Sequence, residues 1–278
     1  MIGNYIKAGG SSKIGNYIKA VASGPSLDPD AAAFLTAASI TDPTITSAIN
    51  TLVLDMKGYG IWTKMKAVYP FVGGTASTHK WNLKDPRDLD AAFRLVFSGG
   101  MTHSSNGILF GGVNGYGDTF FNTDDVTSTG LQSFGVYLRT NPTFAISTNY
   151  EYPTGLRNGI YHLRILNTNP TQTNLRSGTV NSNINGVTGF IAQSRSTNTL
   201  WYGINNSTIT ILPISTSTLG IETNYPFNVG AYQNLSNPSF FSTQEFAFSF
   251  YGEPLLTTEM SDFYTAIQTF QTTLGRQV

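Results

Sequence analysis

The stretch "EFAFSFYG", residues 245–252, predicts a β-strand and, with it, the fold class of the chain. Its aromatic residues recur at every second position, the period at which the side chains of a strand return to the same face. One face is expected to carry Phe246, Phe248 and Phe250, and the other Glu245, Ala247, Ser249 and Tyr251. The apolar face of this strand needs cover from another layer of the protein.

Further segments show the same alternation. The clearest are "AFRLVFS" at residues 92–98, "SFGVYLR" at 133–139, "GIYHLRIL" at 159–166 and "PFNVGAY" at 226–232. Loops rich in Gly, Asn, Ser and Thr separate them, as expected for strands joined by turns. A single sheet could not bury so many apolar faces, so the sequence predicts two sheets packed face to face, a β-sandwich.

Two helices are expected before the strands. Asp28 and Asp42 each precede a proline, the order typical of an N-cap followed by the first helical residue. After the second cap an apolar stripe with helical spacing begins, and Gly58 is expected to end this helix in the left-handed conformation. The stripe consists of Ile45, Ala48, Ile49, Leu52, Val53 and Met56.

A second apolar stripe predicts a helix near residue 278. Its members are Met260, Phe263, Tyr264, Ile267, Phe270 and Leu274, followed by Gly275. This helix should pack on the sandwich or on the early helices. We therefore divide the chain into a repeated segment at residues 1–24, a helical unit at 25–66, and a β-sandwich with its C-terminal helix at 67–278.

The composition argues against several classes of function. The 16 Lys and Arg balance the 16 Asp and Glu among 278 residues, so no basic surface for nucleic acid is expected. The absence of cysteine excludes disulfides and thiol catalysis and fits synthesis in a reducing cytoplasm. No stretch approaches the roughly 18 consecutive apolar residues of a membrane span. We also find no pattern of a secretory signal, and expect a soluble protein without membrane partners.

Residues that could carry catalysis are present but scattered. His79, His103 and His162 lie on three segments with no metal-ligand spacing. The two carboxylates of a glycoside hydrolase would stand two or four residues apart if they shared a strand. No two of the five glutamates do so: Glu151, Glu222, Glu245, Glu253 and Glu259.

Aspartates offer no better site. Asp88 and Asp90 are two residues apart but precede a predicted strand, where Asp often turns the chain. The segment "NGYGDTFFNTDD", residues 114–125, contains oxygen ligands of the kind that calcium takes, but their spacing matches no EF-hand loop. Ordinary turns explain it better. We therefore expect no enzyme activity, no metal site and no cofactor.

Trp201 and Tyr202 are the best candidates for stacking on a sugar, because they lie beside a loop. Adjacent residues of a strand face opposite ways, so at most one of them can line a site while the other packs inside. This pair is the basis for glycan binding as an alternative function.

Several long phrases of the sequence resemble a family of tailed-phage virion proteins, frequent among crAss-like and other phages of Bacteroidetes hosts. They are residues 58–95, "GYGIWTKMKAVYPFVGGTASTHKWNLKDPRDLDAAFRL", residues 189–211, "GFIAQSRSTNTLWYGINNSTITI", residues 228–234, "NVGAYQN", and residues 263–278, "FYTAIQTFQTTLGRQV". The resemblance covers roughly residues 28–278. It implies a jelly-roll sandwich of the concanavalin A or laminin-G type and a structural, non-enzymatic role in the virion.

The beginning of the chain repeats seven residues without change. "IGNYIKA" occurs at residues 2–8 and again at 14–20, joined by the spacer "GGSSK" at 9–13. We expect this segment to anchor the protein by docking on two like surfaces, since linked weak sites gain avidity. The extended spacer spans about 15–18 Å, a distance typical of adjacent subunits in a shell. The residues expected to contact the partner are Ile2, Tyr5, Ile6, Lys7, Ile14, Tyr17, Ile18 and Lys19.

The sequence thus favours a phage virion protein, a capsid-attached head fibre or decoration protein whose partners are capsid or other virion proteins. A tail or tail-fibre component and a lectin-like module for host or mucus glycans remain as alternatives. We expect a homo-oligomer, with a trimer favoured because it would suit a threefold position on a shell.

Overall fold

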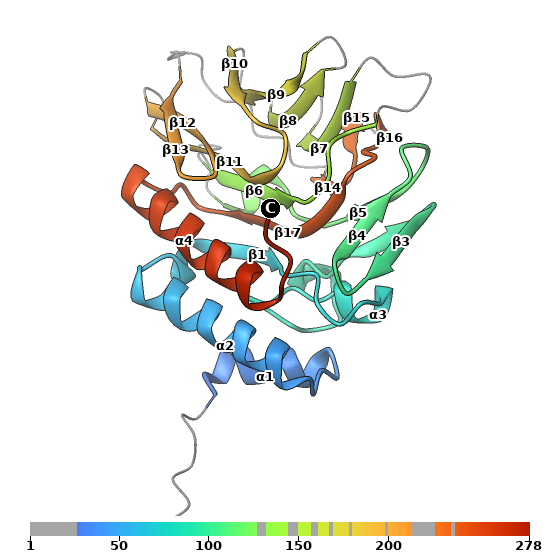
Figure 1. Ribbon diagram of the computed structural model, residues 1–278, viewed down its shortest axis with the longest axis vertical. Helices are drawn as coiled ribbons and strands as arrows, with labels where there is room; N and C mark the ends of the chain where they lie inside the picture. Colours follow the sequence, from blue (N-terminus) through green and yellow to red (C-terminus); the bar gives the residue numbers. More distant parts are fainter. Residues whose placement is uncertain are drawn as a thin grey trace, which may run out of the picture.

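The computed structural model describes residues 27–126, 132–143, 150–156, 161–166, 169–177, 180–197, 200–212, 226–234 and 237–278. Within these residues two largely antiparallel β-sheets pack face to face, and a layer of helices covers one of them (Figure 1). The mainly β, two-sheet sandwich predicted from the sequence is confirmed, with helices before and after its strands.

Sheet A, the sheet beneath the helices, contains eight described strands. Across the sheet they are β13 (Thr208–Ile211), β12 (Leu200–Asn205), β11 (Gly189–Thr197), β6 (Ser133–Leu138), β17 (Glu245–Gly252), β4 (Gly107–Phe110) and β3 (Met101–Ser104), with β1 (Met65–Tyr69) also paired to β17. The sheet is built around β17, which pairs with β6 along one side and with β1 and β4 along the other.

Sheet B, the second sheet, contains nine described strands. Across the sheet they are β10 (Val180–Asn185), β9 (Asn169–Ser177), β8 (Tyr161–Leu166), β7 (Tyr150–Leu156), β14 (Asn228–Val229), β5 (Tyr116–Asp118) and β2 (Val96–Ser98), with β15 (Tyr232–Asn234) and β16 (Asn237–Ser239) attached beside β7. The "AFRLVFS" segment is only partly a strand, because a short 3₁₀ turn, η2 (Asp90–Ala92), precedes it and Phe93 is left-handed, with φ 58°.

The strand "EFAFSFYG" forms as β17, but its face assignment was wrong at two positions: Phe246 packs with Tyr251, and Ala247 packs with Phe248 and Phe250. The register with β6 shifts between Phe246 and Phe248, which marks a β-bulge. Phe246 therefore joins the core between the sheets, whereas Phe248 and Phe250 pack beneath the helices. The sequence alone could not reveal this shift. A β-bulge changes which face the side chains point to, but the order of apolar and polar residues along the strand stays the same.

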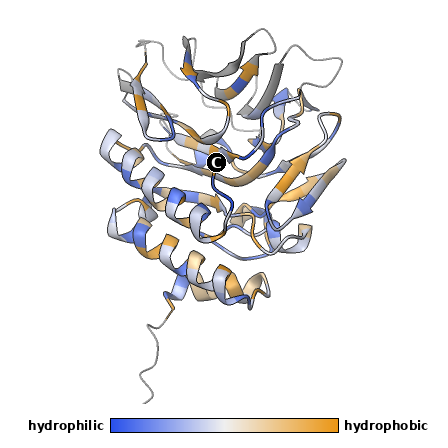
Figure 2. Ribbon diagram, viewed as in Figure 1, coloured by the Kyte–Doolittle hydropathy of each residue, from blue (hydrophilic) through white to orange (hydrophobic). Residues whose placement is uncertain are grey.

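The helices α1 (Pro29–Ala37) and α2 (Pro43–Gly58) begin where the sequence predicts. Asp28 accepts a hydrogen bond from the Asp30 N–H at 3.0 Å, and Asp42 accepts one from the Ile45 N–H at 2.9 Å. Gly58, however, lies inside α2, and the left-handed glycine after the helix is Gly60, with φ 73°. Figure 2 shows hydrophilic and hydrophobic residues interspersed along α2, as expected of a helix that buries one stripe.

The remaining helical elements are α3 (Ala76–His79), η1 (Trp62–Lys64), η3 (Thr123–Asp125) and the long helix α4 (Thr257–Thr273). As predicted, α4 buries Met260, Phe263, Ile267 and Phe270. None of the helices in the described part of the chain is long and apolar enough to cross a membrane.

Two hydrophobic cores hold these layers together. One lies between the sheets and contains Phe134, Val136 and Leu138 of β6. The other lies between sheet A and the helices and joins residues of α1, α2 and α4 to the outer face of β17. The helical unit therefore packs on the sandwich through a shared core, and burial of each large apolar side chain stabilises this arrangement by about 1.5–3 kcal/mol.

Candidate functional site

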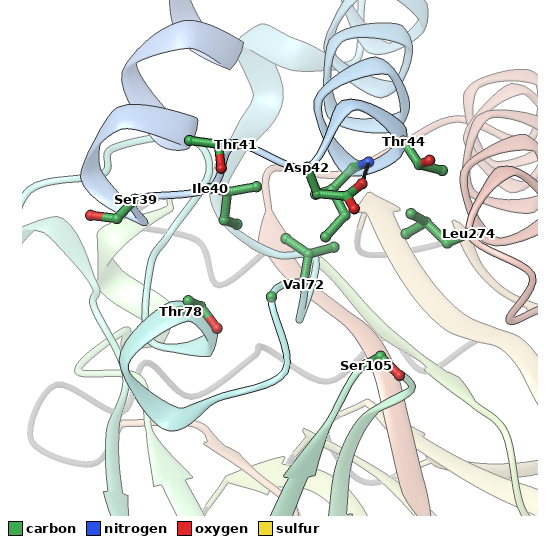
Figure 3. Close-up of a pocket in the computed structure, with 11 residues that line it drawn as sticks. Ser39, Ile40, Thr41, Asp42, Thr44, Val72, Thr78, Ser105 and Leu274 are labelled. Carbon is green, nitrogen blue, oxygen red and sulfur yellow. Dashed lines mark hydrogen bonds between the residues drawn. The ribbon is translucent and has the colours of Figure 1, made fainter.

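A cavity of about 520 Å³ opens where the helical layer meets the sandwich (Figure 3). We call it the junction cavity. Its apolar lining comes from Ile40, Ile45, Val72 and Leu274, with Gly73 beside them. Its polar lining comes from Ser39, Thr41, Asp42, Thr44, Thr78 and Ser105. The cavity therefore combines an apolar floor, several hydroxyl groups and a single carboxylate.

The connection between α1 and α2 forms one side of the junction cavity. Ser39 takes the left-handed conformation, with φ 54°, and the Ile40 N–H donates to the Leu35 carbonyl at 2.9 Å, so that the chain turns sharply after α1. Asp42 then caps α2 and stands exposed at the cavity. The turn after α1 and the N-cap of α2 therefore place these polar side chains at the rim of the cavity.

The loop at residues 70–75 forms the opposite wall. Gly73 has φ 87°, and a Cβ at this position would lie 2.8 Å from the Thr78 Cβ, so only glycine fits here without strain. Thr75 caps the short helix α3, accepting from the Thr78 N–H at 3.3 Å. The wall is thus shaped by its backbone and held close to α3.

Two histidines hold the loop at residues 70–75 in place through hydrogen bonds. The Gly74 N–H donates to Nε2 of His79 at 3.2 Å, and Nδ1 of His79 lies 2.9 Å from Nδ1 of His103. Because Nε2 of His79 accepts, its proton resides on Nδ1 and is donated to His103. Burial, with the neighbouring His103 and Arg276, lowers the pKa of His79 to about 3, and burial also lowers the pKa of His103. Both rings are therefore neutral at pH 7.

Sequence reasoning placed these two histidines on separate segments and found no relationship between them. The fold brings β3 beside the loop at residues 70–75 and unites the rings. No regular spacing could have signalled this pair, because 24 residues separate its members. Among the described residues no three His, Asp or Glu side chains gather as metal ligands.

Arg276 fastens the same wall from the side of α4. Its guanidinium donates to the carbonyls of Phe71 at 2.8 Å and of Pro70 and Ala247 at 3.2 Å each, and to Oε1 of Gln271 at 3.0 Å. Only 2% of this residue is exposed, and burial lowers its pKa to about 9. Neutral carbonyl dipoles surround the buried charge, so Arg276 links α4, the loop and β17.

The junction cavity is suited to binding rather than to bond-making. Among the described residues that line it, Asp42 alone is ionisable, and its side chain accepts the capping hydrogen bond. Covalent or acid–base chemistry needs a nucleophile or a proton donor oriented by a partner group, which this lining does not provide. An apolar floor with a hydroxyl rim and one carboxylate fits a peptide that carries aliphatic or aromatic side chains and a cation.

The glutamates whose side chains the structure describes form ion pairs with Lys or Arg. Glu245 binds Arg139, Glu253 lies 2.9 Å from Lys66, and Glu259 lies 2.5 Å from Lys64. The aspartates of "NGYGDTFFNTDD" serve turns: Asp118 accepts from the Phe120 N–H and Asp125 from the Asn122 N–H. These local bonds are of the kind that the turn interpretation predicts, although Tyr116–Asp118 of the segment forms β5.

The structure describes some of the predicted binding residues and not others. The anchor residues Ile2, Tyr5, Ile6, Lys7, Ile14, Tyr17, Ile18 and Lys19 lie outside the described residues. So does the side chain of Trp201. Tyr202 packs in the core between sheet A and the helices, is 1% exposed, and donates to Oγ of Ser196 at 3.1 Å. Its ring is therefore not available to a sugar, and the assignment of Tyr202 to a glycan site was wrong.

No protein-family description and no curated protein sequence matches this chain. Among solved structures, the chain is similar to a mutant Trypanosoma rangeli sialidase with trans-sialidase activity, at a TM-score of 0.50 and 9% identity, over 81% of this chain and 39% of the sialidase. It also matches domain 4 of a GH43 arabinanase from Geobacillus stearothermophilus, at a TM-score of 0.41 and 14% identity, over 72% of this chain and 98% of that domain.

A third match is the receptor-binding domain of a botulinum neurotoxin mosaic serotype C/D, at a TM-score of 0.44 and 8% identity, over 74% of this chain and 51% of that one. This chain spans about two fifths of the sialidase, so a likeness to that enzyme concerns only part of it. The similarity to the sialidase agrees with the mainly β sandwich seen here. At these identities the likeness is one of fold alone.

Proposed function

We propose that this chain is a non-catalytic structural protein of a tailed-phage particle, a capsid-attached head fibre or decoration protein held by its segment 1–24. The observation that carries the proposal is the unchanged repetition of "IGNYIKA" at residues 2–8 and 14–20. Two identical peptides suit two identical surfaces, and a virion presents identical surfaces at regular distances.

Three further observations support this role. Residues 58–95, 189–211, 228–234 and 263–278 resemble virion proteins of phages that infect Bacteroidetes. The paired glutamates Glu245, Glu253 and Glu259 are engaged in ion pairs rather than facing one another across a substrate site. The helical layer, where Leu27 leads into α1, lies at one end of the molecule, and β8, β9 and β10 lie at the other (Figure 1). The body would thus attach at one end and project at the other.

The anchor is tested by two deletions in the phage genome. Removal of residues 2–13 leaves Met1 followed directly by the second heptapeptide, so the start of the chain keeps the sequence "MIGNYIKA" with one copy instead of two. This variant should join particles less firmly and dissociate more readily on washing, because avidity is lost. Removal of residues 2–24 should abolish incorporation. Full incorporation of the longer deletion would refute the anchor.

Two alternatives are distinguished by further measurements. Antibody-labelled particles seen by electron microscopy place the protein on heads, as proposed, or on tails. A lectin-like role is the second alternative, since the Trypanosoma rangeli neighbour is a sialidase and the arabinanase domain was solved with arabinotriose. Tyr202 is the member of the pair that packs inside, so Trp201 is the residue left to test for this role. A glycan array with the full chain and Trp201→Ala would decide it.

A further inference from the structure

A second cavity of about 370 Å³ adjoins the junction cavity across the connection between α1 and α2. The two cavities share Ser39, Ile40 and Thr41. Leu27 and Leu35 line the second cavity, and no charged residue does so. We call the two adjoining cavities together the α1–α2 groove.

The chemistry of the α1–α2 groove defines the ligand that it fits. Its floor is aliphatic, its rim carries hydroxyl groups, and Asp42 is the only charged residue in either lining. A matching ligand has apolar side chains for the floor, polar groups for the hydroxyls and one positive charge for Asp42. Binding a peptide with an acidic residue would leave a carboxylate near Asp42 and be disfavoured.

The heptapeptide "IGNYIKA" has this composition. Its two isoleucines and its tyrosine can fill apolar cavities, its glycine permits close approach of the backbone, and it carries one lysine and no acid. The second copy ends at Ala20, and only residues 21–26 separate it from Leu27 in the groove. These six residues reach at most about 20 Å, so the second heptapeptide of each chain ends on the same side of the molecule as its own groove. Two copies that face each other through this side are placed to exchange peptides.

We propose that the α1–α2 groove is a receptor for the heptapeptide of a second copy of this chain. The proposal rests on the anchoring role of the repeats proposed above and identifies one of their partners. Each chain carries two identical peptides, whereas its described residues form one such groove, which cannot take both peptides. Copies of the same chain supply further grooves of identical shape. Exchange of the peptides between copies would link them into the expected homo-oligomer.

Asp42→Asn tests the charge in this interaction. Asn caps a helix about as well as Asp, so α2 should remain intact while the negative charge is lost. Self-association of the purified full chain, measured by light scattering across a dilution series, should weaken about three- to fivefold. Lys7→Gln combined with Lys19→Gln should weaken it similarly, and adding Asp42→Asn to that pair should cause little further loss.

The apolar contacts should carry more of the affinity. Tyr5→Ala combined with Tyr17→Ala is expected to weaken self-association about tenfold or more, as for aromatic residues at the centre of an interface. Lys13→Gln is the matched control, because Lys13 lies in the spacer outside both heptapeptides. Asp262→Asn on α4 is the control for loss of a carboxylate. Both controls should associate like the parent chain.

Because the chain has no cysteine, single cysteines can locate the contact directly. Full-length Thr44→Cys, with its thiol at the groove, is mixed with full-length Ala20→Cys, with its thiol at the end of a heptapeptide. Mild oxidation should yield a mixed disulfide several-fold above a control mixture of Ala20→Cys with Thr265→Cys on α4. Peptides that dock only in their own chain would give no excess over this control and would overturn the proposal.

Particle incorporation is measured on the same variants to separate this inference from the proposed function. A chain that shows no self-association, or whose self-association ignores both Asp42→Asn and the tyrosine pair, refutes the groove as receptor even if it still joins particles. A chain that self-associates through the groove but is absent from particles refutes the virion role instead.

Discussion

Nδ1 of His79 and Nδ1 of His103 lie 2.9 Å apart behind the wall of the junction cavity. Two histidine rings in this geometry share one proton, and Nε2 of His79 already accepts from the Gly74 N–H. Protonation of His79 would put a proton on Nε2, which removes the acceptor of the Gly74 N–H and places these two donors against one another. The neutral state of the pair is therefore coupled to the shape of the loop at residues 70–75.

This coupling predicts a pH-dependent stability. His79 has a pKa of about 3 in the folded chain and about 6.5 when unfolded, so below pH 6.5 the unfolded chain binds a proton that the folded chain rejects. The stabilisation is fully present above pH 6.5 and is lost as the pH falls toward 3. Urea unfolding at pH 7 and pH 5 should differ by about 1–2 kcal/mol for this group. His79→Asn should flatten the difference; an unchanged slope would contradict the assignment.

Arg276 should be among the most sensitive positions of the described chain. Arg276→Met removes the donors to the carbonyls of Pro70, Phe71 and Ala247, of which the Ala247 carbonyl keeps Nε2 of Gln271 as a donor at 3.4 Å. We expect a loss of about 2–4 kcal/mol in the free energy of unfolding. The free energy of unfolding of Arg276→Lys should lie between those of the parent chain and Arg276→Met, because an ammonium group cannot reproduce the planar, forked donors of a guanidinium. Arg87→Met, at a side chain 64% exposed, is the control and should change stability by less than about 0.5 kcal/mol.

Two Gly→Ala substitutions should act in opposite directions. A Cβ at Gly58 meets nothing within 4 Å inside α2, so Gly58→Ala should stabilise the chain by about 0.5–1 kcal/mol. A Cβ at Gly135 would lie 2.4 Å from the Ala192 Cβ and 2.7 Å from the Ile191 carbonyl oxygen. Gly135→Ala should therefore destabilise by about 1–3 kcal/mol. Thermal unfolding of both variants checks the pair, and shifts of equal sign would refute the packing at β6.

Tyr202 allows stability and sugar binding to be separated. Tyr202→Ala should cost about 3–5 kcal/mol because it empties a buried site, whereas Tyr202→Phe removes only the hydrogen bond to Ser196 and should cost about 0.5–1.5 kcal/mol. Any glycan-array signal per folded molecule should be the same for Tyr202→Phe and the parent chain. A selective loss of that signal would return Tyr202 to a binding role.

Local patterns in the sequence were enough to predict several helices and strands of this protein. Asp28 and Asp42 were recognisable as caps because an N-cap is a relation between neighbours two or three residues apart. The stripes of α2 and α4 predicted which side chains are buried, since burial of one face follows directly from the period of a helix. The alternation of β6 predicted which of its side chains share the core between the sheets, although both faces of this strand are buried. The two-sheet class followed from the number of such strands.

Only the tertiary structure decided the relations between distant segments. The bulge that turns Phe246 inward depends on the register with β6, and the contacts of His79 with His103 and of Arg276 with Phe71 join residues far apart in the chain. The α1–α2 groove likewise requires the loop at residues 70–75, β3 and α4 to meet. Contacts between such distant segments depend on the packing of the whole core, and the local periodicity of a segment contains no information about them. The doubled heptapeptide was plain from the letters alone, whereas a surface that could receive it emerged only from the fold.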